Sequence, residues 1–149
     1  MTILEGGGAR LLHPFFISLG GTLLMAALFT DYMYSSNALM QWSNFSAWLI
    51  AGGLVLALIA AITLLVEVAV HRAGPIRWLD FILLAAAAVL SIFNVLVHTR
   101  DAGTSVVPTG LTLSVIVAIL LVIAGVRGWT VAAVRLPVGE RELQAGEVR

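Results

Sequence analysis

The chain has 149 residues, of which 60% are hydrophobic and 11% charged, with a formal net charge of +0 at pH 7. A soluble domain carries about 25% charged residues, so this composition, with a mean hydropathy of +1.05, is that of a membrane protein. A neutral chain lacks the basic footprint of a nucleic-acid-binding protein. The absence of cysteine excludes disulfides, thiolate catalysis and cysteine-based zinc or iron–sulfur sites.

Four segments are long and apolar enough to cross a bilayer, whose hydrocarbon core takes about 20 helical residues to span. In chain order they are residues 14–33, 45–70, 78–97 and 109–126, the last with an alternative end at 134. The links are short, which makes neighbouring helices antiparallel, and Gly74-Pro75 is expected to end the second helix. No strand is expected, because an open sheet cannot span lipid.

These segments predict an all-α integral membrane protein, an antiparallel up-down-up-down four-helix transmembrane bundle over residues 1–134 with a polar tail at 135–149. Only Arg100 falls on the side away from the two termini. The other seven arginines fall on the side of the termini: Arg10, Arg72, Arg77, Arg127, Arg135, Arg141 and Arg149. Because basic residues are enriched in cytoplasmic loops, both termini and the tail are predicted to be cytoplasmic.

Ionisable residues recur at helical spacing. His13 and Asp31 are 18 residues apart, which is about five turns at 3.6 residues per turn, so they share one helix face. Charged groups within spans face the bundle interior, so two clusters are expected. The inner cluster comprises His13, Glu67, His71, Asp80 and Arg127. The outer cluster comprises Asp31, Asn94, His98 and Arg100. In the fourth span, the inward face is expected to carry Thr112, Ile116, Ile119, Ile123 and Arg127.

Several segments resemble a known family in their order along the chain: "HP" opening the first span, "TDYMY" closing it, "AWLIAGGLVLALIAAIT", "FNVLVHTRD" and "TGLTLSVIVAILLVIAGVRGW". Together they are similar to the bacterial membrane-protein family called domain of unknown function 2231, over roughly residues 13–139. After the fourth span the family typically has a Tyr-Arg-His; here the segment reads "GWTVAAVRLPVGE", without the histidine and with Arg135 near its place. The resemblance implies a four-span bundle in the bacterial inner membrane, and no established activity.

Each cluster allows a structural and a chemical interpretation. His13 is interpreted as a cap at the membrane surface, the alternative being a haem ligand or proton carrier. Glu67 is expected to pair with the His71 imidazole or with Arg127 to neutralise buried charge. The alternative is a metal site that Glu67 and His71 would form together with His13 or Asp80. In the outer cluster, Asp31 is expected to tie the first span to the third. The alternative there is a pocket for a quinone head group or a small polar ligand.

Two classes of function therefore remain open, and no catalytic or metal-binding residue is predicted. The first is a non-enzymatic accessory or anchor subunit of a membrane assembly, without a cofactor. Its partners would be the lipid bilayer and either another membrane protein or further copies of this chain in a homo-oligomer, with no nucleic acid. The second is an electron-transfer protein that holds b-type haem between His13 and His71.

Overall fold

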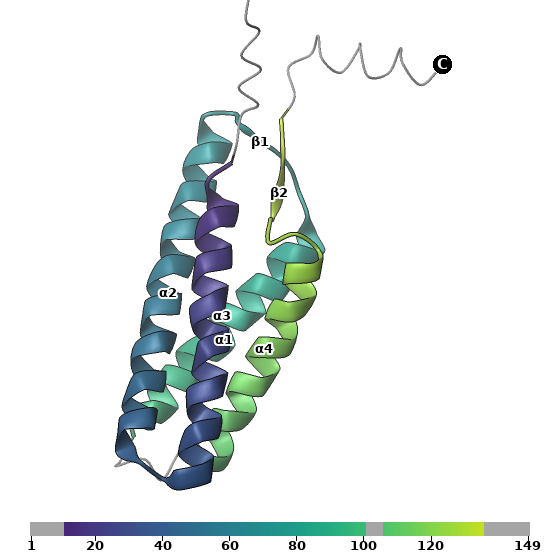
Figure 1. The fold of residues 1–149 in the computed structure, drawn as a ribbon. Helices are drawn as coiled ribbons and strands as arrows, with labels where there is room; N and C mark the ends of the chain where they lie inside the picture. The colour runs from purple at the N-terminus through teal and green to yellow at the C-terminus, as the bar shows by residue number, and fades with distance from the viewer. Residues whose placement is uncertain (1–10, 101–105, 136–149) are drawn as a thin grey trace, which may run out of the picture.

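The structure is a computed structural model that describes residues 11–100 and 106–135. Four long helices form a bundle (Figure 1), and their bounds are α1 His13–Asn37, α2 Met40–Ala69, α3 Trp78–His98 and α4 Leu111–Val126. A π-helical turn, η2 Val106–Gly110, leads into α4. Each helix, with η2 counted as part of the last, is long and apolar enough to cross a membrane. The predicted all-α bundle of four spans is therefore confirmed.

The chain reverses at each connection between helices. In Figure 1 it runs along α1 away from the end that carries the two short strands, returns along α2, and repeats this path through α3 and α4. Hydrogen bonds between distant residues agree with this path, because His13 at the start of α1 contacts Glu67 near the end of α2. At the other end of the bundle, Asp31 in α1 contacts His98 at the end of α3.

The first two helices are joined by a far shorter link than the sequence predicted. The first predicted span ended at residue 33 and the second began at residue 45, but only Ala38 and Leu39 lie between α1 and α2. Ala38 has a left-handed φ of 54° and its N–H donates to the Tyr34 carbonyl at 2.8 Å, a common helix ending. Ser35 and Ser36 lie within α1, and their hydroxyls donate to the carbonyl of Tyr32.

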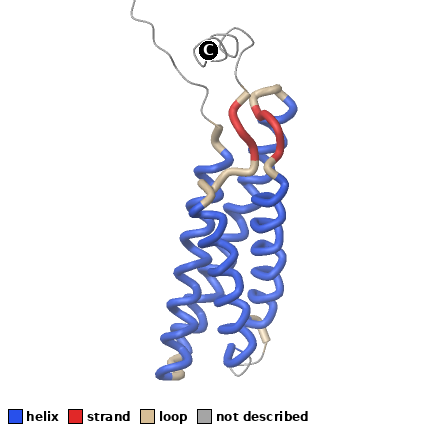
Figure 2. The backbone as a smooth tube through the Cα atoms, turned by 90° about the vertical axis from the view of Figure 1, so that its right-hand side faces the viewer, coloured by secondary structure: helices blue, strands red, loops and turns tan. Residues whose placement is uncertain are grey.

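Two short strands, which the sequence analysis did not predict, pair at one end of the bundle (Figure 2). They are β1 Ala73–Ile76 and β2 Ala132–Val134, and they run antiparallel. α2 ends at Ala69 and α4 ends at Val126, close to the predicted ends at 70 and 126. The alternative end of the fourth span at 134 was wrong, and Gly74-Pro75, which was expected to end the second helix, lies within β1. Because the sheet lies beyond the ends of the helices, its edges need not enter the hydrocarbon core.

The core lies where α1 packs against the other helices, and its buried apolar residues are Leu24, Ala27, Ile50, Ala87, Val117 and Leu121. Small residues allow α1 and α2 to approach closely: a Cβ added to Gly20 would lie 3.0 Å from the carbonyl oxygen of Gly53.

The predicted inward face of the fourth span was wrong. Thr112, Ile116, Ile119 and Ile123 are exposed, whereas the buried face carries Ser114, Val117, Ala118, Leu121 and Ala124. The prediction had placed Thr112 inside as a polar residue. Its hydroxyl instead donates to the carbonyl of Pro108 at 2.8 Å, so it needs no partner in the interior.

Candidate functional site: two polar clusters

One polar cluster lies at the end of the bundle away from the strands and is called here the far-end cluster: Asp31, Asn94, His98 and Ser114. The Asp31 carboxylate and the His98 imidazole are fully buried, with 2.8 Å between Oδ1 and Nε2. The other carboxylate oxygen, Oδ2, accepts a hydrogen bond from the Ser114 hydroxyl. Ser114 in turn accepts from the Asn94 side-chain amide at 2.7 Å. The four residues therefore link α1, α3 and α4 through one chain of hydrogen bonds.

The partners of His98 fix where its protons lie. Nδ1 is 2.9 Å from the backbone carbonyl oxygen of Asn94, which can only accept, so Nδ1 carries a proton. Nε2 faces Asp31, and one further proton is needed between Nε2 and Oδ1 to make that contact a hydrogen bond. Whether this proton sits on nitrogen or oxygen, the pair has no net charge. A neutral pair is what burial between membrane helices favours.

This arrangement differs from a Ser-His-Asp catalytic site. In such a site the imidazole accepts the proton of the serine hydroxyl while the carboxylate holds the other ring nitrogen. Here Ser114 donates to Asp31, and both nitrogens of His98 have other partners. The serine therefore has no imidazole base, and the cluster is built to join helices.

The far-end cluster borders a more open region. A cavity of about 400 Å³ is lined by His98, Arg100 and polar residues at the start of α2, among them Gln41, Ser43 and Asn44. Arg100 is exposed at this cavity. In the part of the chain that the structure describes, the ion-pair partner of Asp31 is His98 rather than Arg100. Among the described residues, only one buried side-chain polar atom has no hydrogen-bond partner, the Oδ1 of Asn94.

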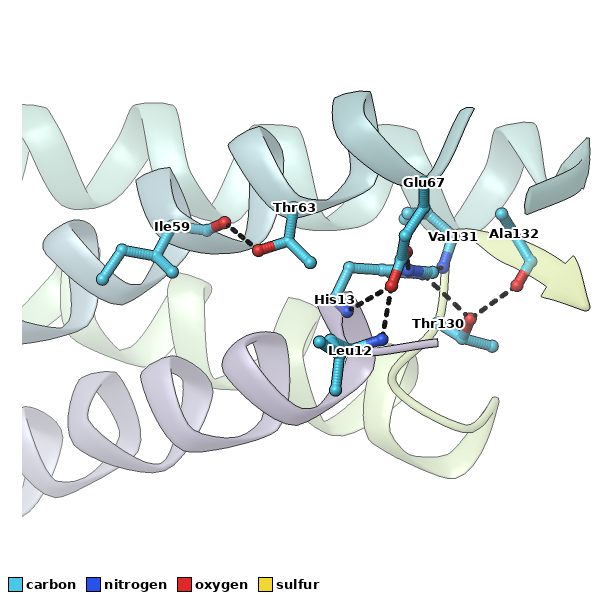
Figure 3. Close-up of polar contacts among 8 residues, drawn as sticks. All are labelled: Leu12, His13, Ile59, Thr63, Glu67, Thr130, Val131 and Ala132. Atoms are coloured by element: carbon cyan, nitrogen blue, oxygen red, sulfur yellow. Dashed lines mark hydrogen bonds and ion pairs between the residues drawn. The ribbon is translucent and has the colours of Figure 1, made fainter. Parts of the chain in front are cut away.

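A second cluster lies beside the strands and is called the sheet-end cluster: His13, Glu67, Asp80, Arg127 and Thr130. In Figure 3 the carboxylate of Glu67 lies against the start of α1. It accepts from the N–H of Leu12 and from His13 Nδ1, the latter at 2.6 Å. His13 Nε2 is 3.2 Å from the Thr130 hydroxyl and 3.4 Å from the N–H of Val131, which can only donate. The imidazole proton therefore lies on Nδ1, toward Glu67.

The other carboxylate of the sheet-end cluster, Asp80, is held by two arginines. Arg77 Nε lies 2.8 Å from Asp80 Oδ2, and Arg127 Nε donates to Oδ1. Arg77 also donates to the backbone carbonyl of Arg127 at 3.1 Å. The hydrogen bond to Asp80 raises the pKa of Arg127. The two guanidinium groups fix the start of α3 to the end of α4 through Asp80.

Three predictions for the inner cluster are wrong or unsupported by these contacts. Glu67 pairs with His13 rather than with Arg127. His13 has an exposed fraction of 0%, so it is a buried link between helices and not a cap at the surface. The third prediction, haem held between His13 and His71, is unsupported. His71 lies two residues after the end of α2 and is exposed, with a left-handed φ of 57°, whereas His13 is buried. The expected tie between the first and third spans, through Asp31, is present.

Sequence reasoning missed two members of these clusters, Ser114 and Thr130. Ser114 could have been found from the spacing of the small residues Gly110, Ser114, Ala118 and Gly125, which marks a close-packed helix face. Thr130 follows a left-handed turn at Gly128 and Trp129, and no helical period predicts its position. In the described part of the chain, no three His, Asp or Glu side chains are grouped so that they could hold a metal ion.

Four apolar spans, closed by buried polar clusters at both ends, define an integral membrane protein of the four-helix class. The family described as predicted membrane protein (DUF2231) matches residues 10–139, which is most of the chain, and the protein belongs to this family. No curated protein and no solved structure matches the chain.

Proposed function

We propose that the protein is a non-enzymatic accessory or anchor subunit of an assembly in the inner membrane of a bacterium. The observation that carries this proposal is the exposure of α2. This helix has 30 residues, and 17% of its most apolar stretch is buried, against 22% for α3 and 33% both for α1 and for η2 with α4. A helix so little covered by its own chain has a long surface available to another membrane protein.

The pattern on α2 supports the same proposal. Val55, Leu58, Ile62 and Leu65 are all exposed, with 52–69% of each side chain accessible. Their spacing of three, four and three residues is the a/d spacing that lets two helices pack along a seam. Lipid also covers such a surface, so the proposal depends on packing complementarity with a partner, which drives helix association in membranes.

The polar clusters support a structural role. Their ionisable groups bond to one another and to the backbone, and each cluster joins at least three segments of the chain. Groups used in this way keep the bundle together, as intramembrane ionisable groups often do. We therefore assign the far-end and sheet-end clusters a structural role: they hold the helices together, and so keep the exposed face of α2 in a fixed position for a partner.

The orientation follows from charge. The end with the strands carries Arg72, Arg77, Arg127 and Arg135 against two carboxylates, Glu67 and Asp80, in the described part of the chain. The enrichment of arginine in cytoplasmic segments supports a cytoplasmic location of this end and both termini. A fluorescent reporter that matures only in the cytoplasm should be active when fused after Arg149, and an inactive fusion that is stably expressed would reverse the orientation.

The experiment that tests the proposed function measures the size of the native assembly. The protein is tagged at its chromosomal locus, extracted in a mild detergent and separated on a native gel. We expect a band far above the 15.8 kDa of one chain, containing a second membrane polypeptide that retrieves this chain when it is tagged in turn. Migration as a monomer or as copies of this chain alone contradicts the proposal.

Haem binding by His13 and His71 has less support. Both ring nitrogens of His13 have partners inside the protein, and His71 is exposed beyond the end of α2. Iron ligation at His13 would therefore displace either Glu67 or Thr130. Absorption spectra of the purified protein, oxidised and reduced, test this alternative. A Soret band that disappears in His13→Ala would replace the accessory role with electron transfer.

A further inference from the structure

A cavity of about 300 Å³ lies among the helices. All of its lining residues are apolar and many are small, including Gly20, Ala57, Ala61, Ala85 and Ala88. A water molecule in such a cavity would lack the two to four polar partners that it normally requires. The occupant that suits this cavity is therefore a hydrocarbon chain.

The cavity has an opening toward the surroundings of the bundle. Ala61 of α2 and Phe81 of α3 line it and are at the same time exposed. In a membrane, the molecules beside these two exposed residues are lipids. A chain from the bilayer can therefore enter between α2 and α3 without separation of the buried core residues.

Positive charge lies at the end of α3 from which the cavity lining begins. Arg77 immediately precedes α3 as its N-cap residue and lies four residues before Phe81, the first cavity-lining residue of that helix. The side chains of Arg77 and Arg127 are 35% and 39% exposed and share the single carboxylate of Asp80. Two guanidinium groups on one carboxylate leave a net positive charge at the surface. Arginine suits phosphate because its planar fork donates two parallel hydrogen bonds.

The distances along α3 match one leaflet of a bilayer. Phe81 to Ala88 spans about 10 Å, and Arg77 to Ala88 about 16 Å, at 1.5 Å per residue. Half of the hydrocarbon core of a bilayer is about 15 Å thick. We propose that the protein binds one anionic phospholipid, with an acyl chain in the cavity between α2 and α3 and the phosphate facing Arg77 and Arg127. This site does not depend on the accessory role proposed above.

Native mass spectrometry of the full chain, released from detergent micelles, tests the proposal. The protein is incubated with equal amounts of phosphatidylglycerol and phosphatidylcholine that carry the same acyl chains. We expect one retained lipid per chain, with phosphatidylglycerol favoured about fivefold. This is the preference expected from about one net positive charge near an anionic head group, since Asp80 offsets one of the two arginines. Equal retention of the two lipids, or retention of neither, overturns the proposal in the unmodified protein.

Two pairs of variants separate the chain site from the head-group site. Ala61→Leu fills the cavity and should abolish lipid retention. Its control, Ala69→Leu, adds the same atoms at an exposed position of α2 that does not line the cavity, and should retain the lipid. Arg77→Gln, which leaves Arg127 on Asp80, should bring the preference for phosphatidylglycerol close to parity. Arg100→Gln at the far end should leave it unchanged.

Either pair can also contradict the proposal. If Ala61→Leu retains lipid as well as Ala69→Leu does, the chain lies elsewhere. If Arg77→Gln keeps the full preference, the phosphate does not face this arginine. Circular dichroism of each variant shows whether it is folded. If a variant does not fold, the proposal is tested by the retention of the two lipids by the unmodified protein.

Discussion

The contact between Asp31 and His98 should make a measurable contribution to the stability of the bundle. The two side chains come from α1 and α3, both are fully buried, and their nearest atoms are 2.8 Å apart. Removal of Asp31 leaves Nε2 of His98 without a partner, and removal of His98 leaves Oδ1 of Asp31 without one. A double-mutant cycle of Asp31→Ala, His98→Ala and the double variant isolates the contribution of the contact itself.

The size of the coupling follows from the environment. Hydrogen bonds between helices in membranes average about 0.6 kcal/mol, with a maximum of about 1.7, because the unfolded helices also find partners in the bilayer. Bonds that involve a charged group are roughly twice as strong as neutral ones. We therefore expect a coupling of about 1–1.7 kcal/mol. Asp31→Ala alone should cost more, about 2–4 kcal/mol, because Ser114 also loses its acceptor and stays buried.

Unfolding of the purified protein in mixed micelles of increasing SDS content, followed by circular dichroism, provides the four free energies. A matched control combines Asp31→Ala with Thr130→Ala at the opposite end of the bundle. These two changes share no partner, so their effects should add within about 0.5 kcal/mol. A coupling between Asp31 and His98 no larger than in this control would refute the interpretation of the far-end cluster as a tie between helices.

Two further predictions concern packing and the sheet-end cluster. Gly21→Ala should destabilise the protein by about 1–3 kcal/mol, because the added Cβ would lie 2.5 Å from the ring of Trp129. The control is Gly52→Ala, because its added Cβ would meet only the flexible side chain of Leu23, at 3.3 Å. Equal losses of stability in the two variants would argue against the packing of the Trp129 indole on α1 at Gly21. Glu67→Ala should lower the free energy of unfolding by about 2–4 kcal/mol, since buried donors lose their acceptor. Thr63→Ala, which removes only a bond within α2, should have a small effect, and the same SDS titration should rank the two in this order.

The number and type of the membrane spans could be predicted because they depend on composition and segment length alone. The faces of the first three helices could also be predicted, since an ionisable residue in a span has a strong preference for the interior. His13 and Asp31 share one side of α1, and both are buried. The same reasoning failed for α4, where Thr112 satisfies its hydroxyl within its own helix and gives no information about the interior.

The pairing of charges could not be predicted from depth. Glu67, Asp80 and Arg127 all lie near one end, and the choice of partner depends on how each helix is rotated and on what adjoins it. The start of α1 brings His13 and the Leu12 N–H to Glu67. Arg77 and Arg127 therefore pair with Asp80 instead. The strands were missed for a related reason: β1 and β2 are only four and three residues long, too short to show a period.

The most direct test of the proposed role is photocrosslinking from α2 in living cells. A photoreactive phenylalanine analogue replaces Leu58 or, as a control on another exposed helix face, Ile119 of α4. The proposed role predicts that irradiation at Leu58 joins the protein to a distinct membrane polypeptide, and that Ile119 yields little of this product. Crosslinks from Leu58 to lipid alone, or only to a second copy of this chain, would contradict the assignment of α2 as the surface that anchors a partner.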